Sequence, residues 1–165
     1  MRFAITIFLF IIGISLGLIA SPALRAEEPK QITIENSQSI EPGPREKASP
    51  KDRIPENDVF VYDDRVIIKL KSPQWSRFTN TNSMDPLFDT EAHVIQLVPR
   101  SADELQVGDI ISYESSYGII IHRIVSLGQD DEGWYAITKG DNNPSRDPAK
   151  VRFSQVKRVV VGIIY

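Results

Sequence analysis

The clearest evidence for a β fold is the segment Gly118-Ile119-Ile120-Ile121-His122-Arg123-Ile124-Val125-Ser126-Leu127. Most of its apolar side chains are β-branched, and such side chains pack well on the pleated surface of a strand. Turn-forming residues border the segment on both sides, at 115–118 and at 129–133. These borders predict a strand that begins near Gly118 and ends near Leu127.

Six further segments have the same short, β-branched and aromatic character: residues 59–62, 65–70, 94–98, 109–114, 134–139 and 156–165. Asp63-Asp64 is a plausible turn between the first two. The helical signal in this part of the chain is one turn at 101–105, where Ser101 could cap and Glu104 stands at the capping-box position. We therefore predict a mainly β domain at residues 59–165, built as a small antiparallel barrel or sandwich.

The N-terminus carries a mostly apolar run, residues 3–20, which follows Arg2 and precedes Glu27 and Glu28. This charge asymmetry places the rest of the chain outside the cytoplasm. As a helix the run would rise about 27 Å, close to the roughly 30 Å of a bilayer core. Residues 1–26 are therefore predicted to form a hydrophobic helix that acts as a retained signal anchor or as a cleaved signal peptide.

Residues 27–58 are predicted to form a linker. Five prolines and many charged side chains fall in this stretch. Such a composition buries too little apolar surface to offset the chain entropy that folding removes. As a coil, the linker would span roughly 30 Å.

The composition also excludes several kinds of site. The chain has 19 basic and 22 acidic residues, a net charge of −3, so it lacks the concentrated positive charge that nucleic-acid binding requires. It has no cysteine, which excludes disulfides, thiolate metal sites and a cysteine nucleophile. Its two histidines do not have the spacing of a metal-binding pair. We expect no metal and no other cofactor.

Ser83 is the candidate nucleophile. It lies in the polar, turn-prone stretch 79–86, with Phe78 before it and Leu87 and Phe88 after it. Apolar anchors on both sides can hold a hydroxyl group rigid yet accessible. Taken alone, however, a serine in such a stretch is more often an ordinary turn residue.

Few residues could act as the base and its partner. His122 lies in an apolar strand, where a histidine is either hydrogen-bonded in the core or faces a cleft. His93 is predicted to be a polar residue at the start of another strand. Asp141 and Asp147 lie in the turn 139–148, where aspartate is common for local reasons. A serine, a histidine and an aspartate are together the groups of nucleophilic acyl transfer.

The order of these motifs resembles the catalytic domain of type I signal peptidases, specifically the archaeal and endoplasmic-reticulum branch that uses histidine. The resemblance rests on Thr81-Asn82-Ser83-Met84-Asp85-Pro86, on Ile121-His122-Arg123-Ile124, and on Lys139-Gly140-Asp141-Asn142-Asn143 with Asp147 six residues after Asp141. The segment Val107-Gly108-Asp109-Ile110-Ile111 matches a further strand start of that family. The resemblance covers about residues 76–165.

The resemblance implies roles for these residues. Ser83 would attack the scissile carbonyl, and His122 would take its proton and return it to the leaving amine. Asp147 is favoured as the residue that orients His122, with Asp141 shaping its loop. In the eubacterial branch of the family a lysine takes the place of this histidine.

Two positions near Ser83 depart from the family pattern. Thr81 replaces the usual serine, but its hydroxyl can still help the backbone N–H of Ser83 to form the oxyanion hole. Asn82 replaces the usual glycine, which leaves the geometry of the loop open. The linker before the domain is also longer than the family leads one to expect.

The implied function is a membrane-associated serine endopeptidase that cleaves signal peptides or secreted preproteins after small residues. The N-terminal segment would contact membrane lipid, with the domain outside the cytoplasm, or the protein would be secreted or periplasmic after signal cleavage. One alternative is a non-catalytic exported β-domain that binds peptides or a secretion partner. Another is a self-cleaving repressor of the same general fold, but those proteins use serine–lysine pairs and a DNA-binding segment.

Overall fold

The computed structural model describes residues 47–165. The expected hydrophobic helix at residues 1–26, and residues 27–46 of the expected linker, lie outside this range. Among residues 47–165, no helix has the length and apolar character that a membrane crossing requires.

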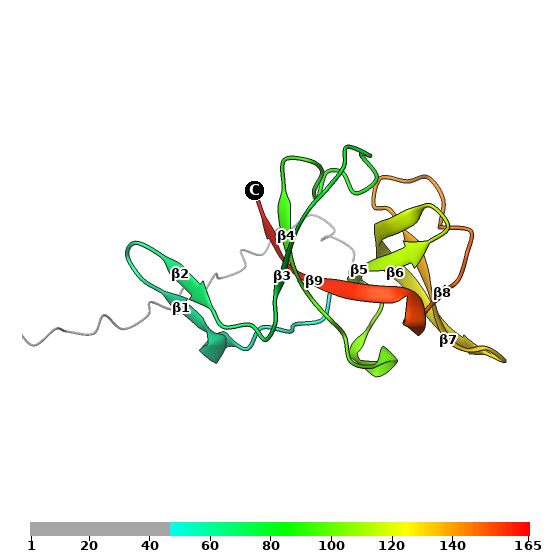
Figure 1. Cartoon of the computed structure of the whole chain (residues 1–165), viewed down its shortest axis with the longest axis horizontal. Coiled ribbons are helices and arrows are strands. Elements are labelled where there is room, and N and C mark those ends of the chain that lie inside the picture. The colour runs from blue at the N-terminus through cyan, green and yellow to red at the C-terminus, as the bar shows by residue number, and fades with distance from the viewer. Residues whose placement is uncertain (1–46) are drawn as a thin grey trace, which may run out of the picture.

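The domain is mainly β, as the sequence predicts, and all its strand pairs are antiparallel. Seven strands form one sheet in the order β3-β4-β9-β5-β6-β7-β8 (Figure 1). Among the described residues, no pairing joins β3 to β8, so the sheet is open rather than a closed barrel. The strands are β3 (Gln74–Arg77), β4 (His93–Leu97), β5 (Ile110–Ser115), β6 (Gly118–Asp130), β7 (Gly133–Lys139), β8 (Val151–Arg152) and β9 (Val156–Ile164).

A separate hairpin precedes this sheet. It consists of β1 (Val59–Val61) and β2 (Val66–Ile68), joined across the predicted Asp63-Asp64 turn. Figure 1 shows it projecting to one side of the seven-stranded sheet. The segments predicted as strands all form strands, with ends that differ by a few residues.

The sequence did not reveal β3 and β8. β3 reads Gln-Trp-Ser-Arg and has no run of β-branched residues, while β8 is only two residues long. The described part of the chain also contains three short 3₁₀ helices: η1 (Glu56–Asp58), η2 (Ala102–Glu104) and η3 (Phe153–Gln155). η2 lies at the predicted helical turn, but the side chain of Ser101 does not cap it. Instead, the Glu104 carboxylate accepts a hydrogen bond from the N–H of Arg100.

Two apolar clusters cover opposite faces of the central strands. Neighbouring residues of β5, Ile110 and Ile111, belong to different clusters, as do Val159 and Val160 of β9. This is the alternation expected when both faces of a strand are buried. One cluster consists of Leu105, Ile111, Tyr113, Ile124, Ala136, Val151 and Val159, and the other of Met84, Phe88, Ala92, Val94, Ile110 and Val160.

Residues 49–53, which we call the strap, lie against the sheet although their composition is that of a linker. The fully buried carboxylate of Asp109 accepts hydrogen bonds from the backbone N–H of Lys51 at 2.8 Å and from Arg53 Nη2 at 2.5 Å. Gly108 has a φ of +101°, and a Cβ there would lie 2.4 Å from the carbonyl oxygen of Ser49. The strap therefore needs a glycine at 108 and a carboxylate at 109.

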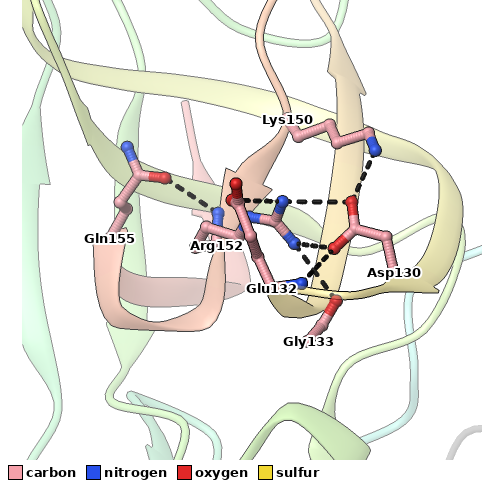
Figure 2. Close-up of polar contacts among 6 residues, drawn as sticks. All are labelled: Asp130, Glu132, Gly133, Lys150, Arg152 and Gln155. Atoms are coloured by element: carbon pink, nitrogen blue, oxygen red, sulfur yellow. Dashed lines mark hydrogen bonds and ion pairs between the residues drawn. The ribbon is translucent and has the colours of Figure 1, made fainter.

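A polar cluster holds β8 beside the turn between β6 and β7 (Figure 2). Arg152 donates to both carboxylate oxygens of Asp130, at 2.7 and 3.0 Å, and to Glu132 at 2.7 Å. Lys150 donates to the same Asp130 at 2.5 Å. Hydrogen bonds from Arg152 and Lys150 lower the pKa of Asp130. This cluster anchors the far end of the loop between β7 and β8, which carries Asp141 and Asp147.

Candidate active site

Ser83 lies in the loop between β3 and β4, and its neighbours are anchored in the core. Met84 and Phe88 are almost fully buried, and the ring of Phe88 stacks on that of Phe78 with centroids 4.5 Å apart. Asn82 has a φ of +54°, in the left-handed region that asparagine tolerates better than most residues. Asn82 therefore meets the backbone requirement that glycine would otherwise meet at this position.

The loop of Ser83 is bonded to the loop after β7. The backbone N–H of Asn142 donates to the carbonyl of Ser83 at 3.0 Å, and the Asn142 side chain donates to the carbonyl of Asn82 at 2.9 Å. Gly140 packs closely against the Ser83 backbone, and a Cβ at position 140 would lie 2.6 Å from the Ser83 carbonyl oxygen. The motif 139–143 thus fixes the backbone of the candidate nucleophile.

Thr81 places its hydroxyl beside Ser83. The two Oγ atoms are 3.1 Å apart, and the backbone N–H of Ser83 points to Thr81 Oγ1 at 3.5 Å. The N–H of Thr81 in turn donates to Asp89 at 3.4 Å. Thr81 Oγ1 therefore lies within reach of both the hydroxyl and the backbone N–H of Ser83.

His122 lies on β6 opposite Ile111 and is only 7% exposed. Its Nδ1 atom is 2.7 Å from Asp147 Oδ2. Among residues 47–165, no group forms a hydrogen bond with Nε2 of His122. With a proton on Nδ1 donated to Asp147, the lone pair of Nε2 is free to accept another proton.

Asp147 is held by more than the histidine. Its Oδ2 atom also accepts hydrogen bonds from Thr138 Oγ1 at 2.6 Å and from Tyr113 Oη at 2.9 Å. The burial of Asp147 opposes ionisation, but the hydrogen bonds from Thr138, His122 and Tyr113 outweigh it and lower the pKa of the carboxyl group. Burial raises the pKa of Tyr113, and its bond to Asp147 adds to the effect. At neutral pH Asp147 is therefore a carboxylate that accepts from a neutral phenol.

Asp141 has different partners. Arg123 binds it in a bidentate manner, with Nε 2.8 Å from Oδ1 and Nη2 2.6 Å from Oδ2. A third donor of Arg123, Nη1, bonds the carbonyl of Gly108 at 2.8 Å. No hydrogen bond joins Asp141 to His122 among the described residues. The two candidate aspartates thus have different partners: Asp147 is bonded to His122, and Asp141 is bonded to Arg123.

Ser83, His122 and Thr81 line the same cavity, of about 470 Å³. The walls come from β3, β4, β5, β6, β9 and the loop of Ser83, and the lining includes Phe78, Met84, Phe88, Gln96, Ser112, Ile120, Ile121, Asn143 and Arg158. His93 does not line it, and instead stacks on Trp75 with ring centroids 4.9 Å apart. No cluster of potential metal ligands occurs in residues 47–165.

Sequence reasoning missed Tyr113 and Thr138, the two further donors to Asp147. Neither belongs to a recognisable motif. Both carry a hydroxyl group on a buried side chain, Tyr113 on β5 and Thr138 on β7, and these strands flank β6, which carries His122. A polar side chain in such a place needs a buried partner, and that requirement is the one signal that could have pointed to them.

Comparisons with known proteins relate part of the chain to a signal peptidase. No family model matches the chain, and no solved structure matches it. The chain is 31% identical over 83 residues to signal peptidase I W of Bacillus subtilis (strain 168), and this stretch is 50% of the chain and 44% of that protein. The chain thus matches less than half the length of this relative. The match supports a relationship to the type I signal peptidase family.

Proposed function

We propose that this chain is a serine endopeptidase of the signal peptidase type, which acts on preproteins or secreted peptides through Ser83, His122 and Asp147. The observation that carries the proposal is that His122, which is bonded to Asp147, lines the same cavity as Ser83. The relationship to signal peptidase I W supports the same reaction class.

The proposed reaction is acyl transfer in two halves. Ser83 Oγ attacks the scissile carbonyl while His122 Nε2 takes its proton. The tetrahedral oxyanion would be stabilised by the Thr81 hydroxyl and the N–H of Ser83. On collapse, the C–N bond breaks, His122 protonates the leaving amine, and an ester on Ser83 remains. Water then attacks this ester with His122 again as the base, which releases the carboxylic acid and restores the serine.

Asp147 would act on the histidine rather than on the substrate. As a carboxylate it keeps the proton of the neutral imidazole on Nδ1, and it stabilises the imidazolium that forms when Nε2 accepts a proton. The hydrogen bonds from Thr138 and Tyr113 would hold Asp147 in the required orientation. Asp141 would act only on the shape of the loop, through Arg123.

We propose further that the base is His122, as in the branch of the family that uses histidine. Lys139 is the lysine of the 139–143 motif, and its Nζ atom bonds the backbone carbonyls of Gly140 and Asp141 at 3.0 and 3.3 Å. Lys139 does not line the cavity of Ser83, whereas His122 does. This arrangement favours a serine–histidine pair over a serine–lysine pair.

The proposed location is a membrane with the domain outside the cytoplasm, or an exported form after removal of residues 1–26. Residues 27–58 would link the two parts, and the substrate would be cut after small residues, as the family resemblance implies. The charge pattern around residues 3–20 supports the orientation.

The deciding experiment is a peptide-cleavage assay with the full chain in detergent. Ser83→Ala and His122→Ala should each abolish cleavage. The matched controls are Ser116→Ala in the exposed turn before β6 and His93→Ala, neither of which lines the cavity. Cleavage at the wild-type rate by either of the first two variants would refute the proposal.

One observation favours the alternative of a peptide-binding domain without catalysis. The hydrogen bond of Ser83 Oγ is made with Thr81, and none joins it to His122 among the described residues. Catalytic hydrogen bonds are often formed only when substrate is bound, so this observation does not by itself exclude catalysis. A protein that binds peptides but leaves them intact for days would support the alternative.

A further inference from the structure

Arg158 of β9 lines the cavity of Ser83 and has no partner for its charge among the described residues. Within residues 47–165, its Nε atom is buried without a hydrogen bond, and no carboxylate lies within ion-pair distance of its guanidinium group. A buried polar atom left unpaired destabilises a fold and calls for an explanation.

Within residues 47–165, the Nε atom of Arg53 is also buried without a hydrogen bond, so what sets Arg158 apart is the lack of a carboxylate partner for its charge. Arg53 is paired with Asp109, Arg123 with Asp141, and Arg152 with Asp130. Each of these three side chains lies partly or largely buried against the sheet, and each has a carboxylate at 2.5–2.7 Å. Arg158 is comparably placed but lacks the carboxylate.

The surroundings of Arg158 are also polar. Ser112 is its direct cross-strand partner on β5, and Ser112 Oγ donates to Gln96 Oε1 of β4 at 3.1 Å. Gln96 and Ser112 are 3% and 4% exposed, and both line the cavity. The Nε2 group of Gln96 has no hydrogen-bond acceptor among the described residues, and it is not sealed from the cavity. Two unused donors, a guanidinium and an amide, therefore lie on one part of the wall.

The lining of the cavity carries more positive than negative charge. Arg77 and Arg158 contribute positive charge to the lining, while Asp89 is its one acidic member. Asp89 accepts a hydrogen bond from the N–H of Thr81 and forms no ion pair with either arginine among the described residues. The field in the cavity therefore favours an anionic group.

We propose that Arg158 and Gln96 form a subsite for a carboxylate of the bound peptide, namely the side chain of an aspartate or glutamate near the scissile bond. The peptide as ligand rests on the proposed function. A guanidinium and an amide supply N–H donors that suit both oxygens of a carboxylate. The bound carboxylate would accept hydrogen bonds from the guanidinium group and from the unused amide together.

The test uses alanine-rich peptides with acetylated N-termini and amidated C-termini, each carrying one glutamate or one glutamine at successive positions around the cut. Amidation removes the C-terminal carboxylate, and a parallel set with a free C-terminus shows whether that group occupies the subsite instead. At one position, the wild type should cleave the glutamate peptide about 10- to 100-fold more efficiently, measured as kcat/KM, than the glutamine peptide.

Three variants isolate the role of Arg158. Arg158→Gln should abolish the preference for glutamate while it still cleaves the glutamine peptide, and Arg158→Lys should keep part of the preference. Arg65→Gln in the β1–β2 hairpin removes the same charge outside the cavity and should leave the preference unchanged. Equal cleavage of both peptides by the wild type at every position would overturn the inference. So would an unchanged preference in Arg158→Gln that is folded as judged by its melting temperature.

Binding to the Ser83→Ala variant separates this inference from the proposed function. Fluorescence anisotropy with labelled versions of these peptides should show that Ser83→Ala binds the glutamate peptide more tightly than the glutamine peptide. This difference in affinity should disappear in the Ser83→Ala/Arg158→Gln double variant. Acid-selective binding without any cleavage by the wild type would support the subsite and refute the peptidase. Cleavage without selectivity in either assay would support the peptidase and refute the subsite.

Discussion

His122 Nδ1 and Asp147 Oδ2 are 2.7 Å apart, and the same carboxylate oxygen accepts hydrogen bonds from Thr138 and Tyr113. Three donors from three adjacent strands thus converge on one atom of a loop residue. Each donor is fixed by the pairing of its strand, so the sheet itself determines the orientation of Asp147 and, through it, of the imidazole.

Asp147→Asn should lower kcat roughly 10³- to 10⁴-fold, because an amide no longer enforces the productive tautomer of His122. The matched comparison is Asp141→Asn, which disturbs the bidentate contact with Arg123 but leaves the histidine untouched. It should lower the free energy of unfolding with a much smaller effect on kcat. Steady-state kinetics and urea unfolding of both variants measure the difference. Equal losses of kcat would show that the two aspartates have the same role.

Thr81→Val should lower kcat about 10²- to 10³-fold, since it removes a hydroxyl 3.1 Å from Ser83 Oγ but keeps the shape of the side chain. Thr81→Ser retains the hydroxyl and should be tolerated. Peptide cleavage under saturating substrate gives kcat for the three forms. If all three have equal turnover, Thr81 has no part in an oxyanion hole.

The lowered pKa of Asp147 predicts a specific loss of stability in acid. Burial works against ionisation, but hydrogen bonds from Thr138, His122 and Tyr113 favour it, so the folded pKa lies below the value of about 3.9 in an unfolded chain. The resulting stabilisation is complete above that value and is lost as the pH falls through the lower folded pKa. The melting-temperature difference between wild type and Asp147→Asn should therefore shrink as pH drops below about 4. A difference that grew there would contradict the sign.

Arg53→Met should lower the free energy of unfolding by about 3–5 kcal/mol, because it leaves the fully buried carboxylate of Asp109 without its charged partner. The double variant Arg53→Met/Asp109→Leu removes both charges and should recover part of this loss. Urea unfolding monitored by tryptophan fluorescence measures both. A double variant less stable than the sum of its single changes would argue against an ion pair at this position.

Gly140→Ala should lower kcat roughly 10²-fold, because its Cβ would lie 2.6 Å from the Ser83 carbonyl oxygen and displace the nucleophile. Gly162→Ala is the matched control, since its Cβ would make only ordinary contacts, at 3.6–3.8 Å, with Ile95. The control should keep its turnover. Full activity in Gly140→Ala would show that the Ser83 loop adapts to the added methyl group.

The sequence was sufficient for features that depend on local pattern. β-branched runs bounded by turn formers predicted seven strands, all of which form. The motif order predicted a site of Ser83, His122 and Asp147, and the catalytic roles of these residues stay a prediction. Partners brought together only by pairing could not be predicted. Tyr113 and Thr138 meet Asp147 because β5, β6 and β7 are adjacent, and no spacing along the chain encodes that adjacency. Arg158 had no signal at all, because an unpaired arginine is recognised only when its surroundings are known.

The strap shows that composition alone can be misleading, because it predicted a linker where the chain is bonded to the sheet. Residues 49–53 are as polar and proline-rich as the rest of the linker, yet the buried carboxylate of Asp109 accepts hydrogen bonds from Lys51 and Arg53. Two or three specific hydrogen bonds outweigh an unfavourable composition when the acceptor is fully buried. Composition describes how much apolar surface a segment can bury, and it says nothing about a single complementary carboxylate.

The strap also bears on where the predicted linker would be attached to the domain. Residues 49–53 are bonded to Asp109, so under the proposed arrangement the distance between residues 3–20 and the Ser83 cavity would depend on the length of chain before Ser49. Added residues after Ile54 would displace the β1–β2 hairpin instead. Arg123 bonds Gly108 on one side and Asp141 on the other, which connects this attachment point to the loop that supports Ser83. Truncated versions intended for crystallisation or assay should accordingly begin before Ser49 rather than at Val59.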